Sequence, residues 1–407
     1  MDLIYINTNG CIEAKLYSKR VERFFKVNNW GFTKDPTKAD IIIFYACGLT
    51  KFDEESSLGI IRKLQMNMKP TARLIVWGCL PKQNPQSLSS VYDGPLIGPL
   101  DTDFFARALE NTIIQYDNIE HAAGDDELES MKKVQSHKMD PVTRSIIFFK
   151  SGWDKACTKK MKKTEPFYIQ IASGCEGQCT YCNERNVFGG IKSRPINNII
   201  SEFQKGLQLG YNRFSLVATD LGVYGKDINY SLSDLIRNMM RSTDKANYSI
   251  ILNQMEPFHL KEQYPDLEEI FSSGKIEEFM CPVQSGSNRI LELMKRRYTA
   301  EEWRNYMLKI HKKFPNIRLN THFLIGFPTE TEEDFKATLK LLDPPLFIES
   351  FYSFKYSNRP NVYSSSFSGQ VPDNIKELRY VKLAQKYAFM YVFNFMRENK
   401  VTNFLVS

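Results

Sequence analysis

Three closely spaced cysteines carry the clearest chemical signal in the chain. Cys175, Cys179 and Cys182 form the pattern Cys-x3-Cys-x2-Cys, and they directly follow residues 167–172, which are predicted to form a strand. Three thiolates can hold one metal centre and leave one coordination position open. A structural zinc site needs a fourth protein ligand, and none of the five histidines lies near this loop in the sequence. The pattern therefore favours a 4Fe-4S cluster with one open iron over zinc, or over cysteines without a metal.

A second set of cysteines, Cys11, Cys47 and Cys79, is spread along the first part of the chain. Each of them comes just after a predicted strand. In a parallel sheet the three loops emerge at one edge, where open α/β sheets bind their ligands, so the three thiols can meet in a second metal site. Cysteine is also a small apolar residue that packs readily in protein interiors. From spacing alone, both interpretations of this set stay open.

Alternating strand and helix patterns predict two α/β units that position these cysteines. The first unit, residues 1–120, is expected to form a Rossmann-like parallel sheet. The second unit, residues 166–372, has six strand patterns with helical patterns between them. This number favours a partial (β/α)6 barrel over a full eight-stranded barrel. The six expected strands are residues 167–172, 214–219, 248–253, 278–283, 318–325 and 349–356.

Two further segments lie outside these units. In residues 121–165 acidic side chains give way to lysines, which indicates a solvated linker, with a basic docking segment for nucleic acid as the alternative. Residues 373–407 contain one amphipathic helix, expected at residues 374–399.

The composition excludes several classes of protein. The 407 residues are 42% hydrophobic, which is too apolar for a disordered chain. The longest apolar runs, residues 41–47 and 387–393, are far shorter than the roughly 20 residues of a membrane span. No signal-peptide pattern opens the sequence, so we expect a cytoplasmic protein with no membrane contact, whose cysteines bind metal instead of forming disulfides. The net charge of +7 permits an anionic partner without requiring one.

These motifs resemble a known family. With Tyr181 before its last cysteine, the Cys-x3-Cys-x2-Cys segment resembles the signature of radical S-adenosylmethionine (SAM) enzymes. The second cysteine set resembles the three motifs in the N-terminal domain of one branch, the methylthiotransferases. Its motifs here are Gly10-Cys11, Ala46-Cys47 and Gly78-Cys79. The resemblance covers about residues 1–380. Further segments that resemble the family are residues 18–21, 220–227, 282–290, 294–299, 325–335 and 354–357.

The resemblance implies a set of cofactors. The Cys-x3-Cys-x2-Cys cluster would bind SAM and cleave it to methionine and a 5′-deoxyadenosyl radical, with electrons from a flavodoxin or ferredoxin type of donor. The second cysteine set would hold an auxiliary 4Fe-4S cluster that carries the sulfur as a bound sulfide or polysulfide. One SAM would methylate that sulfur and a second would supply the radical. The methylthio group would then join a substrate carbon, so the radical chemistry at the clusters leaves no single side chain as the certain catalytic residue.

The same resemblance assigns further residues to cofactor binding. Gln284 and Arg296 resemble groups that contact SAM, with the arginine holding the SAM carboxylate, to which its guanidinium geometry is suited. The alternative for Arg296 is a solvated position at a helix end, which the helix dipole favours. Gly326, after the fifth barrel strand, would let the adenine of SAM approach, or would only form an ordinary turn. Tyr181 completes this cofactor-binding set.

Four other residues receive weaker assignments. Asp220 and Tyr224 are expected at the same rim of the barrel and are candidates for contact with the substrate or SAM. Cys157, in the lysine-rich segment, is expected to be incidental. Cys281 precedes a proline within a predicted strand and is expected to pack in the core.

The end of the chain bears on the expected substrate. Family members that modify tRNA or a ribosomal protein usually end in a small β-barrel, the TRAM domain, and here the chain stops at Ser407 after one helix. Residues 358–361 also depart from the family's Arg-Pro-Gly-Thr run. We therefore expect a peptide or protein substrate in preference to tRNA. The alternatives are a tRNA adenosine methylthiotransferase, a radical SAM enzyme that inserts sulfur or forms a thioether without methylation, and an electron-transfer or metal-carrying protein without turnover.

Overall fold

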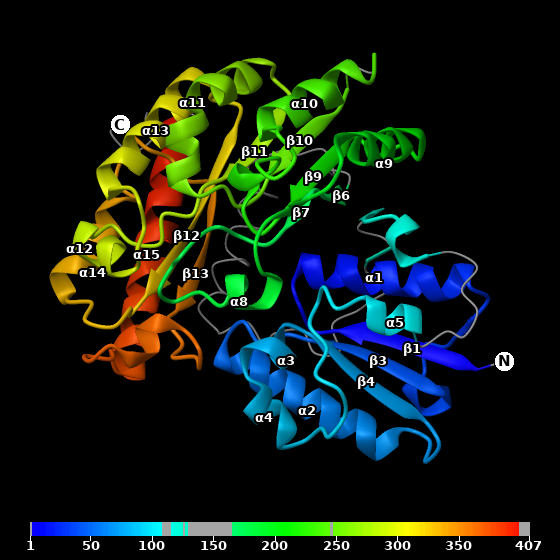
Figure 1. Cartoon of the computed structure of the whole chain (residues 1–407). Helices are drawn as coiled ribbons and strands as arrows, with labels where there is room; N and C mark the ends of the chain where they lie inside the picture. The colour runs from blue at the N-terminus through cyan, green and yellow to red at the C-terminus, as the bar shows by residue number, and fades with distance from the viewer. Residues whose placement is uncertain (1, 108–114, 125–126, 129–164, 245–246, 399–407) are drawn as a thin grey trace.

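The structure is a computed structural model that describes residues 2–107, 115–124, 127–128, 165–244 and 247–398. Within these residues the chain forms a four-stranded sheet, called here the N-terminal sheet, and a seven-stranded sheet, called the barrel sheet (Figure 1). Among the described helices, none combines the length and apolar character that a membrane span requires.

The N-terminal sheet has the strand order β2-β1-β3-β4, with all neighbouring strands parallel. In its central strand, Ile43 and Tyr45 pack on the side of α1, whereas Ile42 and Phe44 pack on the side of α2. A strand that is covered on both faces has apolar residues at successive positions. This explains the unbroken apolar run of residues 41–47. The elements are β1 Leu3–Thr8, α1 Ile12–Val27, β2 Gly31–Phe32, β3 Ile41–Ala46, α2 Lys51–Asn67, β4 Arg73–Gly78, α3 Cys79–Gln83, α4 Pro85–Ser89 and α5 Asp103–Arg107.

The barrel sheet has the order β13-β12-β11-β10-β9-β6-β5, and its strands from β6 to β13 are parallel. The six parallel strands confirm the expected α/β fold with a partial barrel. They are β6 Phe167–Gln170, β9 Arg213–Val217, β10 Ser249–Leu252, β11 Ile276–Met280, β12 Arg318–Ile325 and β13 Ser350–Lys355. The helices between them are α9 Ile196–Gln208, α10 Leu232–Arg241, α11 Pro257–Ser272, α12 Asn288–Leu293, α13 Ala300–Lys313 and α14 Glu332–Lys340.

The segment that we expected to be a linker from residue 121 begins as a strand. β5 (Ala122–Gly124) pairs antiparallel with β6 at the edge of the barrel sheet. Its backbone is held from the other half of the molecule, because Arg23 of α1 donates a hydrogen bond to the Ala122 carbonyl at 2.5 Å. The sequence prediction was wrong here because three small residues show no strand periodicity. The lysine-rich remainder of that segment, with Cys157, lies outside the described residues.

The last helix, α15 (Asp373–Glu398), lies within one residue of the expected range and packs on the barrel. Leu383, Tyr387 and Met390 are buried in the barrel core. The Tyr387 hydroxyl donates to the carbonyl of Glu349 at 2.5 Å, which fixes the helix beside the start of β13.

A short helix of the barrel half, α8 (Glu184–Phe188), packs into the N-terminal half (Figure 1). Phe188 is buried in the same apolar cluster as Tyr17 and Tyr45, and its ring stacks on that of Tyr17 with 6.2 Å between centroids. The Tyr17 hydroxyl in turn accepts a hydrogen bond from the Gln170 side chain of β6 at 2.7 Å. These contacts hold the two sheets in one orientation.

A buried ion pair adds to this junction. Arg359, which follows β13, pairs with Glu54 of α2, and the two side chains are only 7% and 10% exposed. A buried charge that loses its partner is strongly destabilising, because its desolvation is no longer compensated.

We predict that Arg359→Leu lowers the free energy of unfolding by about 3–5 kcal/mol, because it leaves the buried Glu54 carboxylate without a counter-charge, with only the Asn84 amide donating to it at 3.0 Å. Chemical denaturation followed by circular dichroism measures the loss. The matched control is Arg237→Leu, which removes an arginine from ion pairs with the exposed Asp266 and Glu269 and should cost less than about 1 kcal/mol. Equal losses for the two variants would contradict a special role of the junction pair.

Candidate metal centres at the junction of the two sheets

The Cys-x3-Cys-x2-Cys segment forms a loop that leaves the barrel sheet beyond β6, as the sequence predicted. It follows the short strand β7 (Ala172–Ser173), which pairs with β8 (Lys192–Ser193), and it ends at α8. Two of its thiols accept backbone hydrogen bonds, Cys175 from Gly177 N–H at 3.2 Å and Cys182 from Glu184 N–H at 3.4 Å. Backbone N–H groups directed at sulfur are a means by which proteins tune iron–sulfur clusters.

The cysteine loop begins at Gly174, where the backbone leaves no room for a side chain. This glycine has a φ of +80°, and a Cβ atom built on it would lie 2.0 Å from the carbonyl oxygen of Gly190. The next residue, Cys175, donates its N–H to the Gly189 carbonyl at 3.3 Å. Only glycine therefore fits the position that directs the chain into the cysteine loop.

The second cysteine set is brought together by the strand order. Cys11 caps the start of α1 after β1, Cys47 follows β3, and Cys79 opens α3 directly after β4. Because β1, β3 and β4 are neighbours and parallel, the three residues lie at one edge, as predicted. Burial raises the pKa of the Cys79 thiol well above its usual range, and the nearby Glu184, Cys47 and Cys11 add to the shift. Cys79 also lies 3.2 Å from the Tyr45 hydroxyl.

The spread of the thiols bears on which metal they suit. Among the described residues, one group of three or more potential ligands has all its ligand atoms within 4.8 Å of one another, and that group is Asp220, Glu256 and His259. Neither cysteine triplet is that compact. Sulfur ligands of a single tetrahedral zinc lie only about 3.8 Å apart, given a zinc–sulfur bond of about 2.3 Å. In this structure neither cysteine triplet has the compact arrangement that a single tetrahedral zinc needs.

The compact group of Asp220, Glu256 and His259 is explained without a metal. The Asp220 carboxylate accepts backbone hydrogen bonds from Gly222 at 2.9 Å and from Glu256 at 3.2 Å. Glu256 forms an ion pair with Arg296 at 3.3 Å. Its charge is thus already compensated inside the protein.

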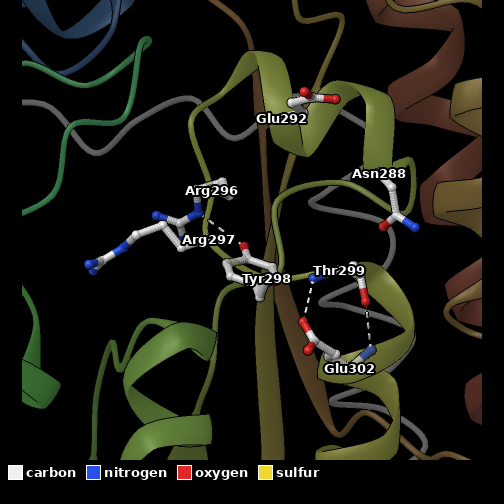
Figure 2. A pocket seen from close by; sticks show the side chains of 7 residues that line it. All are labelled: Asn288, Glu292, Arg296, Arg297, Tyr298, Thr299 and Glu302. Carbon is white, nitrogen blue, oxygen red and sulfur yellow. Dashed lines mark hydrogen bonds between the residues drawn. The ribbon is translucent and has the colours of Figure 1, made fainter.

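Arg296 lies beside the cysteine loop. Its guanidinium donates to the Cys179 sulfur at 3.1 Å and to the Tyr298 hydroxyl at 3.0 Å. The helix that we expected to end at this residue, α12, ends at Leu293, and Lys295 beyond it has a φ of +56°. The alternative of a solvated arginine at a helix end is therefore wrong, because the Arg296 side chain is 7% exposed. Arg296 helps to line a pocket of about 370 Å³ beside α12 and α13. In Figure 2, Arg296 and Arg297 lie to one side of Tyr298, and Asn288 lies to the other.

The other residues assigned to SAM lie near this arginine or on the same rim. Gln284 has a φ of +67°, and its backbone pairs with β12 through His322 and Leu324. The Tyr181 ring lies 6.5 Å from that of Phe327. Gly326 has a φ of +73°, and a Cβ atom there would meet Lys376 of α15 at 2.4 Å. The packing of α15 thus explains this glycine without any ligand.

Asp220 and Tyr224 follow β9, as expected, but they do not present free polar groups. Both are buried. The Tyr224 hydroxyl donates to the Arg194 carbonyl at 3.0 Å. Asp220 Oδ1 accepts both backbone hydrogen bonds described above, and Oδ2 lies 3.6 Å from His259 Nε2. Contact of these side chains with the substrate or SAM therefore stays a prediction, and in this structure their polar atoms are engaged within the protein. Cys281 is fully buried, in agreement with its expected core position.

Sequence reasoning missed two acidic residues beside the candidate ligands. Glu13 and Glu184 each follow a candidate ligand by two residues, Cys11 in one case and Cys182 in the other. Burial raises the pKa of Glu184 to about 7. Burial, and then the charge of Glu184, raises the pKa of Glu13 to about 8. Glu184 also contributes to the raised pKa of Cys11, Cys79 and Cys182.

Comparison with known proteins supports this picture. A family model described as "Radical SAM superfamily" matches residues 169–342, and one described as "Uncharacterized protein family UPF0004" matches residues 3–95. The chain is 26% identical over 399 residues to the tRNA-2-methylthio-N(6)-dimethylallyladenosine synthase of Bdellovibrio bacteriovorus, covering 93% of this chain and 79% of that protein. It is 27% identical over 340 residues to the probable threonylcarbamoyladenosine tRNA methylthiotransferase of Pyrococcus abyssi, covering 83% and 73%.

A third relative modifies a protein, and solved structures share the fold. The ribosomal protein uS12 methylthiotransferase RimO of Protochlamydia amoebophila is 26% identical over 367 residues, covering 87% of this chain and 70% of that protein. The radical S-adenosylmethionine methyltransferase TsrM of Kitasatospora setae, with cobalamin and a [4Fe-4S] cluster bound, aligns with a TM-score of 0.57 at 11% identity. This alignment covers 89% of this chain and 74% of TsrM.

We predict that Gly174→Ala prevents iron–sulfur assembly on the Cys-x3-Cys-x2-Cys loop, because the added methyl group would displace the loop from Gly190. Iron content and visible absorbance after anaerobic reconstitution measure the loss. The matched control is Gly274→Ala, which has a similar φ of +69° and no atom within 4 Å of the added Cβ. It should cost about 1–2 kcal/mol of backbone strain and keep full iron content. Full iron content in Gly174→Ala would show that the loop tolerates the shift.

Proposed function

This chain belongs to the radical SAM methylthiotransferase family, and from that premise we propose that it attaches a methylthio group to an N6-substituted adenosine of tRNA. The observation that supports the proposal is that α3, which Cys79 opens, packs against α8, which begins two residues after Cys182. An unactivated C–H carbon does not react with a thiolate, so a radical has to be generated next to the sulfur that replaces the hydrogen. A junction with two adjacent sets of cluster ligands meets that requirement.

The choice of tRNA departs from our expectation of a peptide or protein substrate. That expectation came from the end of the chain, and the relatives do not support it. Two of the three relatives described above are named for methylthiolation of tRNA adenosines, and they match over most of this chain. The third is named for a ribosomal protein. The net charge of +7 agrees with a polyanionic partner.

We assign the cluster ligands within this proposal. Cys175, Cys179 and Cys182 would hold the 4Fe-4S cluster that binds SAM. The second cysteine set, Cys11, Cys47 and Cys79, would hold an auxiliary cluster. When bound, the first cluster supplies the electron for SAM cleavage, with a flavodoxin or ferredoxin type of protein as its source, and the second supplies the sulfur as sulfide or polysulfide.

The surrounding side chains prepare the site for this chemistry. Arg296 places a positive charge against the Cys179 sulfur, which favours the thiolate that a cluster requires. We assign the same guanidinium to the carboxylate of SAM, for which its fork of donors is suited. Glu256 holds it in position from the opposite side. Gln284 and Tyr181, from the neighbouring rim, complete the proposed SAM contacts.

The first test is the product. We expect tRNA from cells that express this chain to contain an adenosine derivative heavier by one sulfur and one methylene group, which is absent when Cys175→Ala replaces the wild type. Nucleoside mass spectrometry after enzymatic digestion detects it. A product heavier by sulfur alone would assign the reaction to sulfur insertion without methylation. An unchanged nucleoside profile would contradict the tRNA proposal.

The second test separates the two cysteine triplets. Alanine at Cys175, Cys179 or Cys182 should abolish formation of 5′-deoxyadenosine from SAM in reduced protein. Alanine at Cys79 should leave that cleavage measurable and stop sulfur attachment. Chromatography of the SAM products and mass spectrometry of the RNA provide the two readouts.

Cys281→Ala is the control for this series, because Cys281 is a cysteine buried in the barrel core, away from both sets in the sequence. It should retain both activities. Sulfur attachment by the Cys79→Ala variant would contradict the auxiliary assignment, while an inactive Cys281→Ala variant would point to general instability.

A further inference from the structure

The side chain of Tyr45 lies among the loops that carry the second cysteine set. Tyr45 belongs to β3, two residues before Cys47, and it is only 1% exposed. Its hydroxyl oxygen lies 3.2 Å from the Cys79 sulfur. A Cβ atom built on Gly10, the residue before Cys11, would lie 3.7 Å from the Tyr45 ring. One buried aromatic ring is thus in contact with the loops after β1 and β4 and sits close to the loop after β3.

Packing holds this ring in one position. The edge of the ring meets that of Trp77 with 4.9 Å between centroids, and the ring stacks on Tyr17 with 6.4 Å between centroids. Gly78 has a φ of +111°, and a Cβ atom built on it would lie 2.7 Å from the Tyr45 ring. Glycine at position 78 therefore gives the ring its space, and the rigid ring fixes the hydroxyl beside the Cys79 sulfur.

The partner of this hydroxyl is unusual for a buried tyrosine. Within the described part of the chain the Tyr45 hydroxyl has the Cys79 sulfur as its hydrogen-bond partner. By comparison, the Tyr17 hydroxyl binds a side-chain amide at 2.7 Å, and the Tyr92 hydroxyl binds backbone groups of β4 at 3.2 and 3.3 Å. Buried tyrosine hydroxyls generally need a partner, and the sulfur of a thiol is a weak acceptor. Burial of the Tyr45 hydroxyl is therefore poorly compensated while Cys79 is a thiol.

A metal-bound cysteine would remove this deficit. The sulfur is then a thiolate that carries no hydrogen, so the Tyr45 hydroxyl has to be the donor. Hydrogen bonds to a charged sulfur are stronger than those to a neutral thiol. Hydrogen bonds to the ligand sulfurs also help to set the reduction potential of an iron–sulfur cluster, because they stabilise the negative charge that reduction adds.

We propose that Tyr45 is a positioning residue for the auxiliary cluster, whose hydroxyl donates a hydrogen bond to the Cys79 sulfur and raises the reduction potential of that cluster. The inference rests on the proposed function, which assigns a cluster to Cys11, Cys47 and Cys79. It deepens that function, because it names a residue that determines how readily this cluster accepts an electron. A purely structural role, in which the ring only fills space in the core, is the alternative.

The test isolates the second cysteine set in the full chain. A background variant carries alanine at Cys175, Cys179 and Cys182, so that a reconstituted cluster has to use the other set. Potentiometric titration followed by electron paramagnetic resonance measures its reduction potential. In this background Tyr45→Phe keeps the ring and removes the hydroxyl. We expect unchanged iron content and a more negative potential, with the ratio of reduced to oxidised cluster lower by about threefold or more at a given applied potential, as the loss of one hydrogen bond would cause.

A second measurement detects the hydrogen bond itself. Electron–nuclear double resonance of the reduced cluster in H2O and in D2O reports exchangeable hydrogens close to the ligand sulfurs. The background variant should show the coupling of the tyrosine hydroxyl hydrogen, and Tyr45→Phe should lose it. A ring that only fills space would move neither the potential nor this coupling.

The matched control is Tyr92→Phe, which removes a buried hydroxyl from the same sheet. That hydroxyl binds Leu74 and Val76 of β4 and not a cysteine. Both phenylalanine variants should lose about 0.5–1.5 kcal/mol of stability, measured by chemical denaturation, but Tyr92→Phe should keep the potential and the coupling. An equal shift of the potential in both variants would mean a general loosening of the sheet and would overturn the proposal.

The outcomes separate this inference from the function on which it rests. An unchanged potential in Tyr45→Phe, or a changed potential with the coupling retained, would overturn the role of the hydroxyl and leave the function standing. RNA without attached sulfur, together with the expected shift, would contradict the proposed function alone. If the background variant binds no iron, the same titration on the chain with all six cysteines decides. A single cluster there would overturn the auxiliary assignment and this inference together, and two clusters of which Tyr45→Phe shifts neither would overturn the inference.

Discussion

The packing of α8 against the N-terminal sheet is the contact on which the candidate site depends. The order of strands in a sheet determines which loops of that sheet lie close together. It does not determine how the cysteines of one sheet lie relative to those of the other. α8 follows Cys182 after one residue, and its Val187 and Phe188 are buried among side chains of the N-terminal half. Burial of two such side chains contributes about 1.5–3 kcal/mol each. The same few contacts that stabilise the junction thereby set the separation of the two thiol triplets.

Charge is distributed unevenly around this junction. Glu184 contributes to the raised pKa of the Cys11, Cys47, Cys79 and Cys182 thiols, while Arg296 contacts the Cys179 sulfur. This arginine is not free to move away, because Glu256 and Tyr298 bind it from two directions. Its charge is paired with that of Glu256, so the guanidinium is held beside the cysteine loop by an ion pair as well as by hydrogen bonds.

The sequence allowed the strands, the partial barrel and the placement of both cysteine sets to be predicted, because these follow from apolar periodicity and from the rule that loops of parallel strands share an edge. It did not reveal β5, whose three small residues depend on a distant partner for their structure. It placed Asp220 and Tyr224 after β9 correctly, but it could not show which backbone groups their polar atoms bind, because local turn geometry decides that. Glu13 and Glu184 were missed for a related reason. Their proximity arises only from packing between the halves, although their shared spacing from a cysteine was visible.

The antiparallel strand β5 has a consequence for the integrity of the barrel. β5 pairs with the edge of β6, whose backbone N–H and C=O groups could otherwise pair with another chain. β5 itself has only three residues and so offers little backbone for such pairing. Its anchor is Arg23 of α1, so this protection is supplied by the N-terminal half. A barrel produced without that half would leave the edge of β6 unpaired and would tend to self-associate through that strand. The first hundred residues thus help to keep the rest of the chain from aggregating.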